Sequence, residues 1–211
     1  MTIDEYIEAH IDPEGDYLHR LYRATNTQLL YGRMASGHTQ GRLLKMLVEM
    51  IRPNRILEIG TFSGYSALCM AEGLQPGGML HTVEIFDEIE DFTRPWLEQS
   101  AFADRITFHI GDAMEVVPRL GLTFDMAFID GNKRTYLDYY HLVMQHMKPG
   151  GYIVADNTLW DGHVVETPPV KDPQTRGIME FNDFVANDPR VEKVILPIRD
   201  GLTIIRIKET E

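Results

Sequence analysis

The sequence predicts an α/β fold in which a mostly parallel sheet carries helices on both faces and ends in an antiparallel hairpin. Between residues 55 and 155, short apolar runs alternate with segments of helical periodicity, and turns rich in Gly, Pro or acidic residues separate them. This alternation is the pattern of parallel strands joined by crossover helices. Two further apolar runs, 191–198 and 202–207, flank Arg199-Asp200-Gly201, and Asp-Gly is a hairpin signal. The last two strands should therefore pair antiparallel in a Rossmann-like sheet.

Residues 1–52 are expected to form an N-terminal helical segment, because apolar residues recur there at helical spacing. The predicted helices of this segment cover residues 3–11, 17–30 and 40–51, with a loop at 32–37. The Arg-Pro-Asn sequence at 52–54 should end the last of them.

Strands and helices should then alternate. The strands are predicted at 55–59, 79–85, 106–110, 124–129 and 152–155, the last one after a turn at 148–151. The helices are predicted at 64–74, 86–101, 113–120, 135–147 and 176–186. The one long irregular stretch, 158–172, is rich in Pro and charge, and loops of that length are often lids or binding loops.

Length and composition indicate one α/β domain over residues 1–211, with 44% hydrophobic and 25% charged residues. The formal net charge is −12 and basic residues are scattered, which argues against a nucleic-acid partner. Cys69 is the only cysteine, so no intrachain disulfide is expected, and it should be a small buried hydrophobe. The first residues are acidic without a long apolar run, so neither a signal peptide nor a membrane span is expected and the cytoplasm is the expected location.

The turn after the first strand indicates a ligand that is not a dinucleotide. The strand runs into Gly60, and glycine at the end of a parallel strand lets a ligand approach the backbone closely. The next glycine is Gly64, so the turn lacks the G-x-G-x-x-G spacing that seats a pyrophosphate. Phe62 lies in the turn and Glu58 just before it. A carboxylate there suits a cationic group, such as the ammonium of a methionyl moiety, better than a diphosphate.

Acidic residues also end the next two strands. Glu84 ends the second strand, where an acid commonly accepts hydrogen bonds from ribose hydroxyls. Asp112 follows the third strand and could accept from an adenine amino group. The alternative is that these acids only cap the helices that follow. Acids at three consecutive strand ends, Glu58 included, favour the ligand interpretation.

These features resemble the class I S-adenosylmethionine-dependent methyltransferases. Their nucleotide motif is similar to residues 58–64, Glu-Ile-Gly-Thr-Phe-Ser-Gly, and their sheet ends in the same kind of hairpin. The resemblance implies that S-adenosylmethionine is the cofactor, with Ser66 near its methionyl end, Glu84 on its ribose and Asp112 near its adenine. The cofactor site that the resemblance implies comprises Met34, Glu58, Gly60, Thr61, Ser66, Glu84, Asp112, Ala113 and Asp130.

Oxygen ligands follow the fourth and fifth strands. Asp130 ends the fourth strand, Asp156 and Asn157 end the fifth, and neighbouring parallel strands bring these ends to one edge of the sheet. Two carboxylates and an amide carbonyl form an all-oxygen set that suits Mg²⁺, Mn²⁺ or Ca²⁺ and is poor for zinc. The alternative is that Asp156-Asn157 is only a turn, since both residues favour turns.

From about residue 34 to residue 207, the chain resembles the cation-dependent caffeoyl-CoA and catechol O-methyltransferase family. Residues 130–136, 150–162 and 196–204 carry this resemblance. It implies that Asp130, Asp156 and Asn157 bind a divalent cation, with Mg²⁺ the first candidate, and that Lys133 is the general base. It also implies a homodimer that uses the N-terminal helices. The acceptor pocket that it implies is lined by Met34, Trp160, Asp161 and Asp200.

Two departures from the plant members concern the acceptor. Asn132 stands where plant members usually carry a second acid, and Asp161 stands where they usually carry Asn. These differences leave the chemistry intact and argue against a CoA-ester acceptor.

The expected reaction is methylation of one hydroxyl of a catechol-like small molecule. A phenol has a pKa of about 10 and is a weak nucleophile at neutral pH, so chelation by a divalent cation should favour the phenolate. Lys133 is expected to take the proton, the alternative being a solvated lysine at a helix start. Three other functions stay open: a metal-independent small-molecule methyltransferase, a nicotinamide-dependent oxidoreductase, and a non-catalytic protein that keeps the nucleotide pocket.

Overall fold

The described residues, 1–166 and 171–209 of a computed structural model, contain a seven-stranded sheet. Its strands are β1 (Arg55–Ile59), β2 (Met79–Glu84), β3 (Ile106–Ile110), β4 (Phe124–Ile129), β5 (Met147–Asp156), β6 (Val191–Leu196) and β7 (Leu202–Ile207). Their order across the sheet is β3-β2-β1-β4-β5-β7-β6. The first five strands run parallel, whereas β7 pairs antiparallel with both β5 and β6. This arrangement confirms the predicted fold class, including the terminal hairpin.

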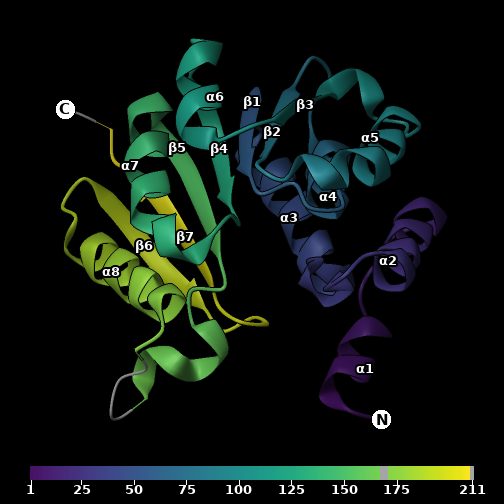
Figure 1. The fold of residues 1–211 in the computed structure, drawn as a ribbon, viewed down its shortest axis with the longest axis horizontal. Helices are drawn as coiled ribbons and strands as arrows, with labels where there is room; N and C mark the ends of the chain where they lie inside the picture. The colour runs from purple at the N-terminus through teal and green to yellow at the C-terminus, as the bar shows by residue number, and fades with distance from the viewer. Residues whose placement is uncertain (167–170, 210–211) are drawn as a thin grey trace.

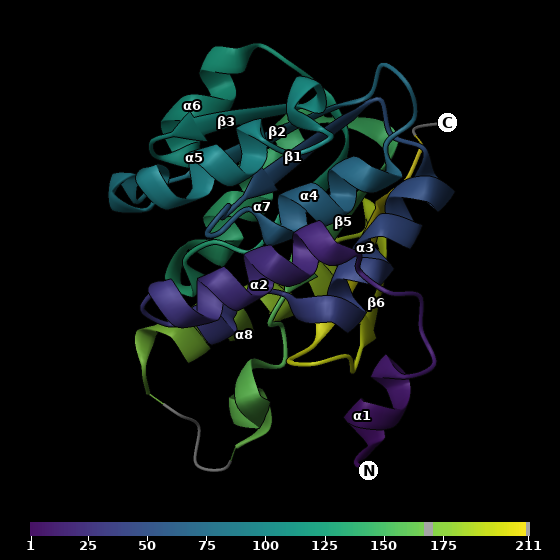
Figure 2. The same cartoon turned by 90° about the vertical axis from the view of Figure 1, so that its right-hand side faces the viewer.

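Helices cover both faces of the sheet (Figure 1). On one face lie α2 (Asp16–Gln28), α3 (Gly37–Ile51), α4 (Tyr65–Gly73) and α5 (Glu90–Glu98), and Figure 2 shows the first three in front of the sheet. On the other face lie α6 (Ala113–Leu120), α7 (Tyr136–His146) and α8 (Pro173–Asn187). The short helix α1 (Ile3–Glu8) lies apart from the sheet. Five 3-10 turns among the described residues are η1 (Gly32–Met34), η2 (Asp87–Ile89), η3 (Ala103–Arg105), η4 (Lys133–Thr135) and η5 (Trp160–Val165).

The central strands β1 and β4 are largely apolar because they are buried on both faces. Successive side chains of a strand point to opposite sides of the sheet. In β4, Met126 and Phe128 pack with the side of α3 and α4, whereas Ala127 and Ile129 pack with the side of α6 to α8. All four side chains are fully buried, and Cys69 of α4 is also buried.

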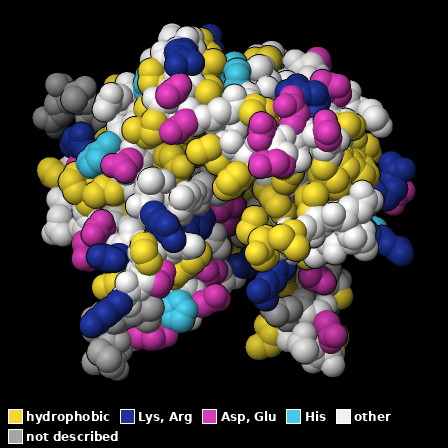
Figure 3. Space-filling model, viewed as in Figure 1, with side chains coloured by type: hydrophobic (Ala, Val, Ile, Leu, Met, Phe, Trp, Pro, Cys, Tyr) yellow, Lys and Arg dark blue, Asp and Glu magenta, His cyan; other side chains and the backbone are white. Residues whose placement is uncertain are grey.

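The surface is predominantly acidic, in line with the net charge of −12. On the face shown in Figure 3, Lys and Arg side chains lie dispersed among Asp and Glu side chains.

The helix α1 exposes apolar side chains, including Ile3 (79% exposed) and Tyr6 (51%). None of the helices that the structure describes is long and apolar enough to cross a bilayer.

Two segments expected to be irregular are partly ordered into elements. Residues 148–151, expected to form a turn, belong to β5, which begins at Met147 and pairs irregularly with β4 near Phe124. A register irregularity of this kind lets a strand continue through a Pro-Gly-Gly sequence. The stretch 158–172 contains η5, and its residues 167–170 lie outside the described residues.

Two helices begin or end differently from the prediction. The helix expected over 86–101 is divided into η2 and α5 and ends at Glu98. The helix α8 begins at Pro173 rather than at residue 176. The reason is that the Asp172 carboxylate accepts from the next two non-proline backbone N–H groups, and proline suits the first helical turn. The other predicted elements agree with the structure to within a few residues.

The carboxyl ends of β1 and β4 approach each other so closely that only glycine fits at residue 60. Gly60 has a φ of +100°, which residues with a side chain rarely adopt. A Cβ atom at this position would lie 2.3 Å from the backbone carbonyl oxygen of Asp130. Backbone hydrogen bonds fix the approach: the Asp130 N–H donates to the Ile59 carbonyl at 2.8 Å, and the Gly60 N–H donates to the Val83 carbonyl at 2.9 Å. Gly60 therefore joins the ends of β1, β2 and β4.

Gly60→Ala is expected to lower the free energy of unfolding by about 2–5 kcal/mol, because it combines backbone strain with a clash against a packed strand. Gly77→Ala is the matched control. Gly77 also has a positive φ, +84°, but nothing lies within 4 Å of its Cβ position. Only the strain remains there, about 1–2 kcal/mol. Urea unfolding of both variants and the wild type measures the difference, and equal losses would contradict the close approach.

Candidate functional site

The turn between β1 and α4 is tightly bent and is tied to the end of β2. Phe62, in this turn, has a φ of +46°, a conformation that is unusual for a bulky residue. Its backbone N–H donates to Oε2 of Glu84 at 2.8 Å, which holds the turn in place. The Ser63 hydroxyl is buried and has no hydrogen-bond partner among the described residues. Because a buried polar group without a partner costs free energy, the turn fits a ligand that supplies one.

Glu84 organises two loops at the end of β2. It is only 6% exposed, and its Oε1 accepts from the Phe86 backbone N–H at 3.0 Å while Oε2 accepts from Phe62. A carboxylate oxygen has two lone pairs, so each oxygen keeps an acceptor position after these bonds. Two neighbouring ribose hydroxyls match such a pair of acceptors. The predicted ribose contact of Glu84 is therefore compatible with the geometry and stays a prediction.

Glu58 lies beneath the turn. Its side chain is fully buried, and its oxygens accept from the Ser66 hydroxyl at 2.6 Å and the Thr82 hydroxyl at 2.5 Å. The Thr61 hydroxyl lies 2.6 Å from that of Thr82, so three of the predicted cofactor residues share one network. Burial raises the pKa of Glu58 to about 8, although the bonds from Ser66 and Thr82 oppose the rise. Support of the turn is the role that the geometry assigns to Glu58, and its contact with a cationic ligand stays a prediction.

The other residues predicted for the cofactor are less constrained. The exposed Asp112 caps α6 by accepting from the Met114 backbone N–H at 2.9 Å, as the capping alternative predicted. That bond uses one oxygen and is compatible with an adenine contact at the other. Ala113 is buried beside it, and Met34 lies in η1 with 56% of its surface exposed. The contacts of these residues with the cofactor stay predictions.

Asp130 and Asp156 end adjacent parallel strands. In the pairing of β4 with β5, Ile129 lies opposite Ala155, so the two acids that follow lie at neighbouring positions on one edge. Burial raises the pKa of Asp130 to about 6. The positive charge of Lys133 opposes this rise, and the negative charge of Asp156 adds to it. The structure thus brings together two of the three predicted cation ligands, and Asn157 follows directly.

Lys133 is buried beside Asp130, which contradicts the alternative of a solvated lysine. Its Nζ donates to Oδ1 of Asp130 at 2.7 Å and to the Tyr136 hydroxyl at 2.8 Å. The Tyr136 hydroxyl also lies within hydrogen-bonding distance of the carbonyl oxygens of Ile129 (2.9 Å) and Asp156 (2.7 Å). The ammonium group is therefore fixed at the ends of both β4 and β5.

Both oxygens of the Asp156 carboxylate accept hydrogen bonds. Oδ1 accepts from the Asn157 backbone N–H at 2.8 Å, and Oδ2 accepts from Nε2 of Gln40 at 2.7 Å. Gln40 is fully buried on α3, and its Oε1 accepts from Nη1 of Arg199 at 3.3 Å. Gln40 and Arg199 are not among the residues predicted from the sequence, because a polar residue within an amphipathic helix gives no local signal of a partner so distant in the chain.

Asp161 and Asp200 lie together near Asp156, and Trp160 directly precedes Asp161 in the chain. The Asp161 backbone N–H donates to the Asp200 carboxylate, and the Leu159 N–H donates to the Asp200 carbonyl at 2.9 Å. Trp160, Asp161 and Asn157 have φ values of +48°, +50° and +56°. Strained conformations of this kind cluster at functional sites. Burial also raises the pKa of Asp200. The role of Trp160, Asp161 and Asp200 in the acceptor pocket stays a prediction.

The donor set fits a hard divalent cation. Across residues 1–166 and 171–209, no three His, Cys, Asp or Glu side chains gather into a metal cluster, so the candidate ligands are two carboxylates and an amide. All of them offer oxygen, which Mg²⁺, Mn²⁺ and Ca²⁺ prefer. Asp130 and Asp156 are neighbouring acids, and a cation there would neutralise their mutual repulsion.

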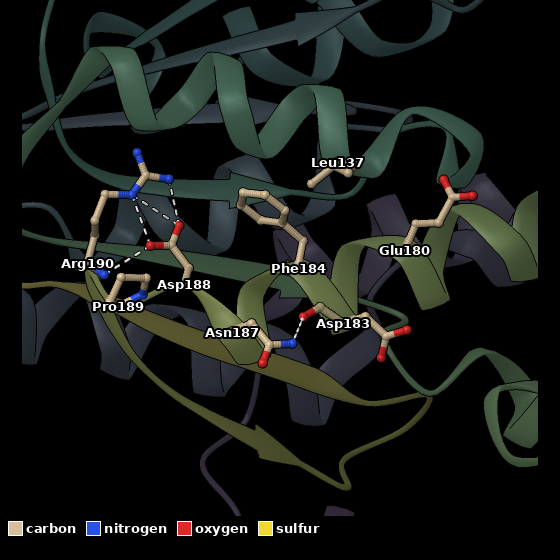
Figure 4. A pocket seen from close by; sticks show the side chains of 8 residues that line it. All are labelled: Leu137, Glu180, Asp183, Phe184, Asn187, Asp188, Pro189 and Arg190. Atoms are coloured by element: carbon tan, nitrogen blue, oxygen red, sulfur yellow. Dashed lines mark hydrogen bonds and ion pairs between the residues drawn. The ribbon is translucent and has the colours of Figure 1, made fainter.

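An open groove of about 760 Å³ lies between α7 and the C-terminal part of α8 (Figure 4). At one end of the groove, Arg190 pairs with Asp188 at 2.6 Å. The residues that line it are Leu137, Glu180, Asp183, Phe184, Asn187, Asp188, Pro189 and Arg190. None of the residues predicted for the cofactor, the cation or the acceptor belongs to this lining, so the groove is separate from the candidate site.

Glu58→Gln should become more stable relative to the wild type as the pH rises. The folded-state pKa of Glu58, about 8, lies above the ordinary value of 4.5. The stability contributed by the protonated acid is therefore fully present below pH 4.5 and is lost as the pH rises to about 8, whereas Gln stays neutral. Thermal unfolding at several pH values measures this, since 1 kcal/mol shifts Tm by about 2–4 °C in a protein of this size. Glu8→Gln, the same change at an exposed position, is the control. A Tm difference that does not vary with pH would contradict the buried acid.

The chain is similar to known O-methyltransferases. The chain matches the family model described as O-methyltransferase over residues 7–208. It is 34% identical to caffeoyl-CoA O-methyltransferase 1 of Eucalyptus globulus over 185 residues, which cover 82% of this chain and 74% of the relative. It is 35% identical to tricin synthase 1 of Oryza sativa subsp. japonica over 190 residues, which cover 83% of this chain and 75% of the relative.

Solved structures of O-methyltransferases have the same fold. The O-methyltransferase from Bacillus cereus, in complex with SAH, superposes with a TM-score of 0.90 at 28% identity and covers 98% of this chain and 97% of its own. The O-methyltransferase TomG from Streptomyces achromogenes, in complex with SAM, gives 0.89 at 28% identity, with 98% and 96% covered. These matches exclude the nicotinamide-dependent oxidoreductase considered from the sequence. The chain belongs to the O-methyltransferase family, and it is a class I S-adenosylmethionine-dependent O-methyltransferase similar to the caffeoyl-CoA enzymes.

Proposed function

We propose that this enzyme methylates one hydroxyl of a catechol-like small molecule and that it depends on a divalent cation. The observation that carries the proposal is that Asp130 and Asp156 lie side by side, with buried Lys133 paired with Asp130, at the same edge of the sheet as the Gly60 turn. Two relatives named for caffeoyl-CoA and tricin support a phenolic acceptor. A caffeoyl group carries two adjacent hydroxyls, which suits a site with open cation positions.

The turn around Gly60 is proposed to bind S-adenosylmethionine, which supplies the methyl group. Glu84 would accept from the ribose hydroxyls through the lone pairs that Phe62 and Phe86 leave unused. Glu58 would hold the turn from below. In this division Glu84 contacts the cofactor and Glu58 supports the turn.

Asp130, Asp156 and Asn157 are proposed to hold the cation, with Mg²⁺ the first candidate and Mn²⁺ or Ca²⁺ the alternatives. When bound, a divalent cation stabilises the phenolate form of a hydroxyl and can hold two neighbouring oxygens. The protein's part is to fix the ligands. Lys133 orients Asp130, and two N–H donors orient Asp156.

Nζ of Lys133 is proposed to take the proton of the reacting hydroxyl when it is in its neutral form. Its neighbour Tyr136 is fully buried, and burial raises the pKa of that phenol well above its ordinary value. Tyr136 therefore stays protonated and orients Lys133. Holding the acceptor and the methyl donor in one geometry supplies much of the remaining acceleration.

Met34, Trp160, Asp161 and Asp200 are proposed to line the acceptor pocket. Asn132 and Asp161 argue against a CoA-ester acceptor, so free catechols and small catechol esters are the preferred class. The homodimer, the cytoplasmic location and the single-domain organisation stay predictions.

The acceptor is expected to need two adjacent oxygens and a divalent cation. Caffeate and p-coumarate are a matched pair, since they differ by one hydroxyl group. Caffeate should be methylated at least about 100-fold faster, because correct positioning of reactants is worth factors of this size. Initial rates with Mg²⁺ and with a chelator measure both requirements. Equal rates for the two acceptors would refute chelation, and unchanged rates in chelator would favour the metal-independent alternative.

Lys133→Ala and Asp156→Ala should fail in different ways. Asp156→Ala should lose cation binding and activity together. Lys133→Ala should retain cofactor affinity and should still bind the cation at saturating concentration. Its kcat, measured at saturating cation, should fall by about 10²–10⁴-fold, and higher pH should partly restore kcat because hydroxide can then remove the proton.

A kcat-against-pH profile with calorimetric cation titration separates these outcomes. Lys148→Ala is the control, because it also removes a lysine paired with an acid, Asp125, but at the other end of the sheet. If Lys133→Ala had the wild-type kcat at every pH, the general-base role of Lys133 would be wrong and its role would be structural.

A further inference from the structure

Gln40 connects two parts of the candidate site that are distant in the chain. It lies on α3 with its side chain fully buried, and its Nε2 donates to Oδ2 of Asp156, 116 residues away, at 2.7 Å. The other oxygen of Asp156 accepts from the Asn157 backbone N–H. No other side-chain donor reaches this carboxylate within the part of the chain that the structure describes.

Arg199 fixes which way the Gln40 amide points. A guanidinium group has only donors, so the amide must turn its oxygen toward Arg199 and its NH₂ group toward Asp156. The opposite orientation would set two donors against each other and an amide oxygen against a carboxylate. Nη1 of Arg199 also donates to the Ser36 carbonyl, and Arg199 itself has a φ of +49°. A strained residue of this kind persists where its surroundings hold it.

We propose that Gln40 is a positioning residue for Asp156, kept in its donating orientation by Arg199. The proposal rests on the cation site proposed above. Groups that hydrogen-bond to a metal ligand fix the direction of that ligand, and their removal typically costs about 10–100-fold in metal affinity. Gln40 is the only side chain among the described residues that donates to Asp156, so it carries that role for this ligand.

The same contacts link the cation site to the loop before α3. Arg199 touches both Gln40 and Ser36, and Ser36 follows η1, which carries the predicted pocket residue Met34. The orientation of Asp156 is therefore set by the N-terminal segment and by the hairpin turn between β6 and β7. Neither segment supplies a cation ligand itself.

The test compares Gln40→Met with the wild type and with Gln145→Met. Methionine keeps the volume of glutamine but has no N–H donor, and Gln145 is an exposed residue of α7. Three quantities are measured: Mn²⁺ affinity by calorimetry without acceptor, SAH affinity, and the Tm of the metal-free protein. We expect Gln40→Met to bind Mn²⁺ about 10–100-fold more weakly, with SAH affinity unchanged. At saturating Mn²⁺, kcat should return toward the wild-type value, and Gln145→Met should match the wild type throughout.

The outcomes separate this proposal from the cation site on which it rests. If the wild type binds no Mn²⁺, the proposed cation site is wrong. If the wild type binds Mn²⁺ and folded Gln40→Met binds it equally well, the positioning role is wrong, even if Tm falls. If Gln40→Met does not fold, Gln40→Asn carries the same comparison. It keeps an amide but shortens the side chain by one methylene group, so it too should lose Mn²⁺ affinity.

Discussion

The close approach of the Gly60 and Asp130 backbones is the constraint on which the site depends. The turn proposed to bind the cofactor and Asp130, the first proposed cation ligand, share a contact that leaves no room for a side chain. The Asp130 N–H is paired with the Ile59 carbonyl across the same contact. The methyl donor and the acceptor must lie close together in the reaction. The contact between Gly60 and Asp130 holds the proposed cofactor turn beside the proposed cation site in the ligand-free protein.

Three acids near this contact, all buried or half-buried, are stabilised in different ways. Glu58 is surrounded by hydroxyl donors and has a raised pKa, so it favours the protonated form. Asp130 is paired with the ammonium group of Lys133. Asp156 is held by N–H donors from Gln40 and its own neighbour in the chain. One edge of a sheet can therefore carry several acids, because each avoids the cost of a buried, unpaired charge by a different route.

The sequence was sufficient for the strand pattern, the terminal hairpin and the approach of Asp130 to Asp156, because strand periodicity fixes which residues reach the carboxyl edge. The role of Lys133 was inferred from the family resemblance instead. It was not sufficient for helix starts set by capping, as at Asp172, or for the path of β5 through a Pro-Gly-Gly sequence. The burial of Glu58 was also missed, since a carboxylate at a strand end looks the same whether it faces a ligand or the interior. Gln40 could not be found at all, because only the folded chain brings α3 to the end of β5.

The antiparallel pairing of β7 has a consequence for how the enzyme can diversify. Where the cofactor is proposed to bind, each strand end leads into a helix that packs on the sheet, so a change of loop length would shift a packed element. Arg199 and Asp200 lie instead in the short turn between two antiparallel strands, with no helix to displace. The turn is nevertheless tied to the rest of the site, because Arg199 donates to Gln40 and the Asp200 carbonyl accepts from the Leu159 N–H. A substitution of Asp200 would therefore change chiefly the proposed acceptor pocket, whereas a substitution of Arg199 would also disturb the proposed cation site.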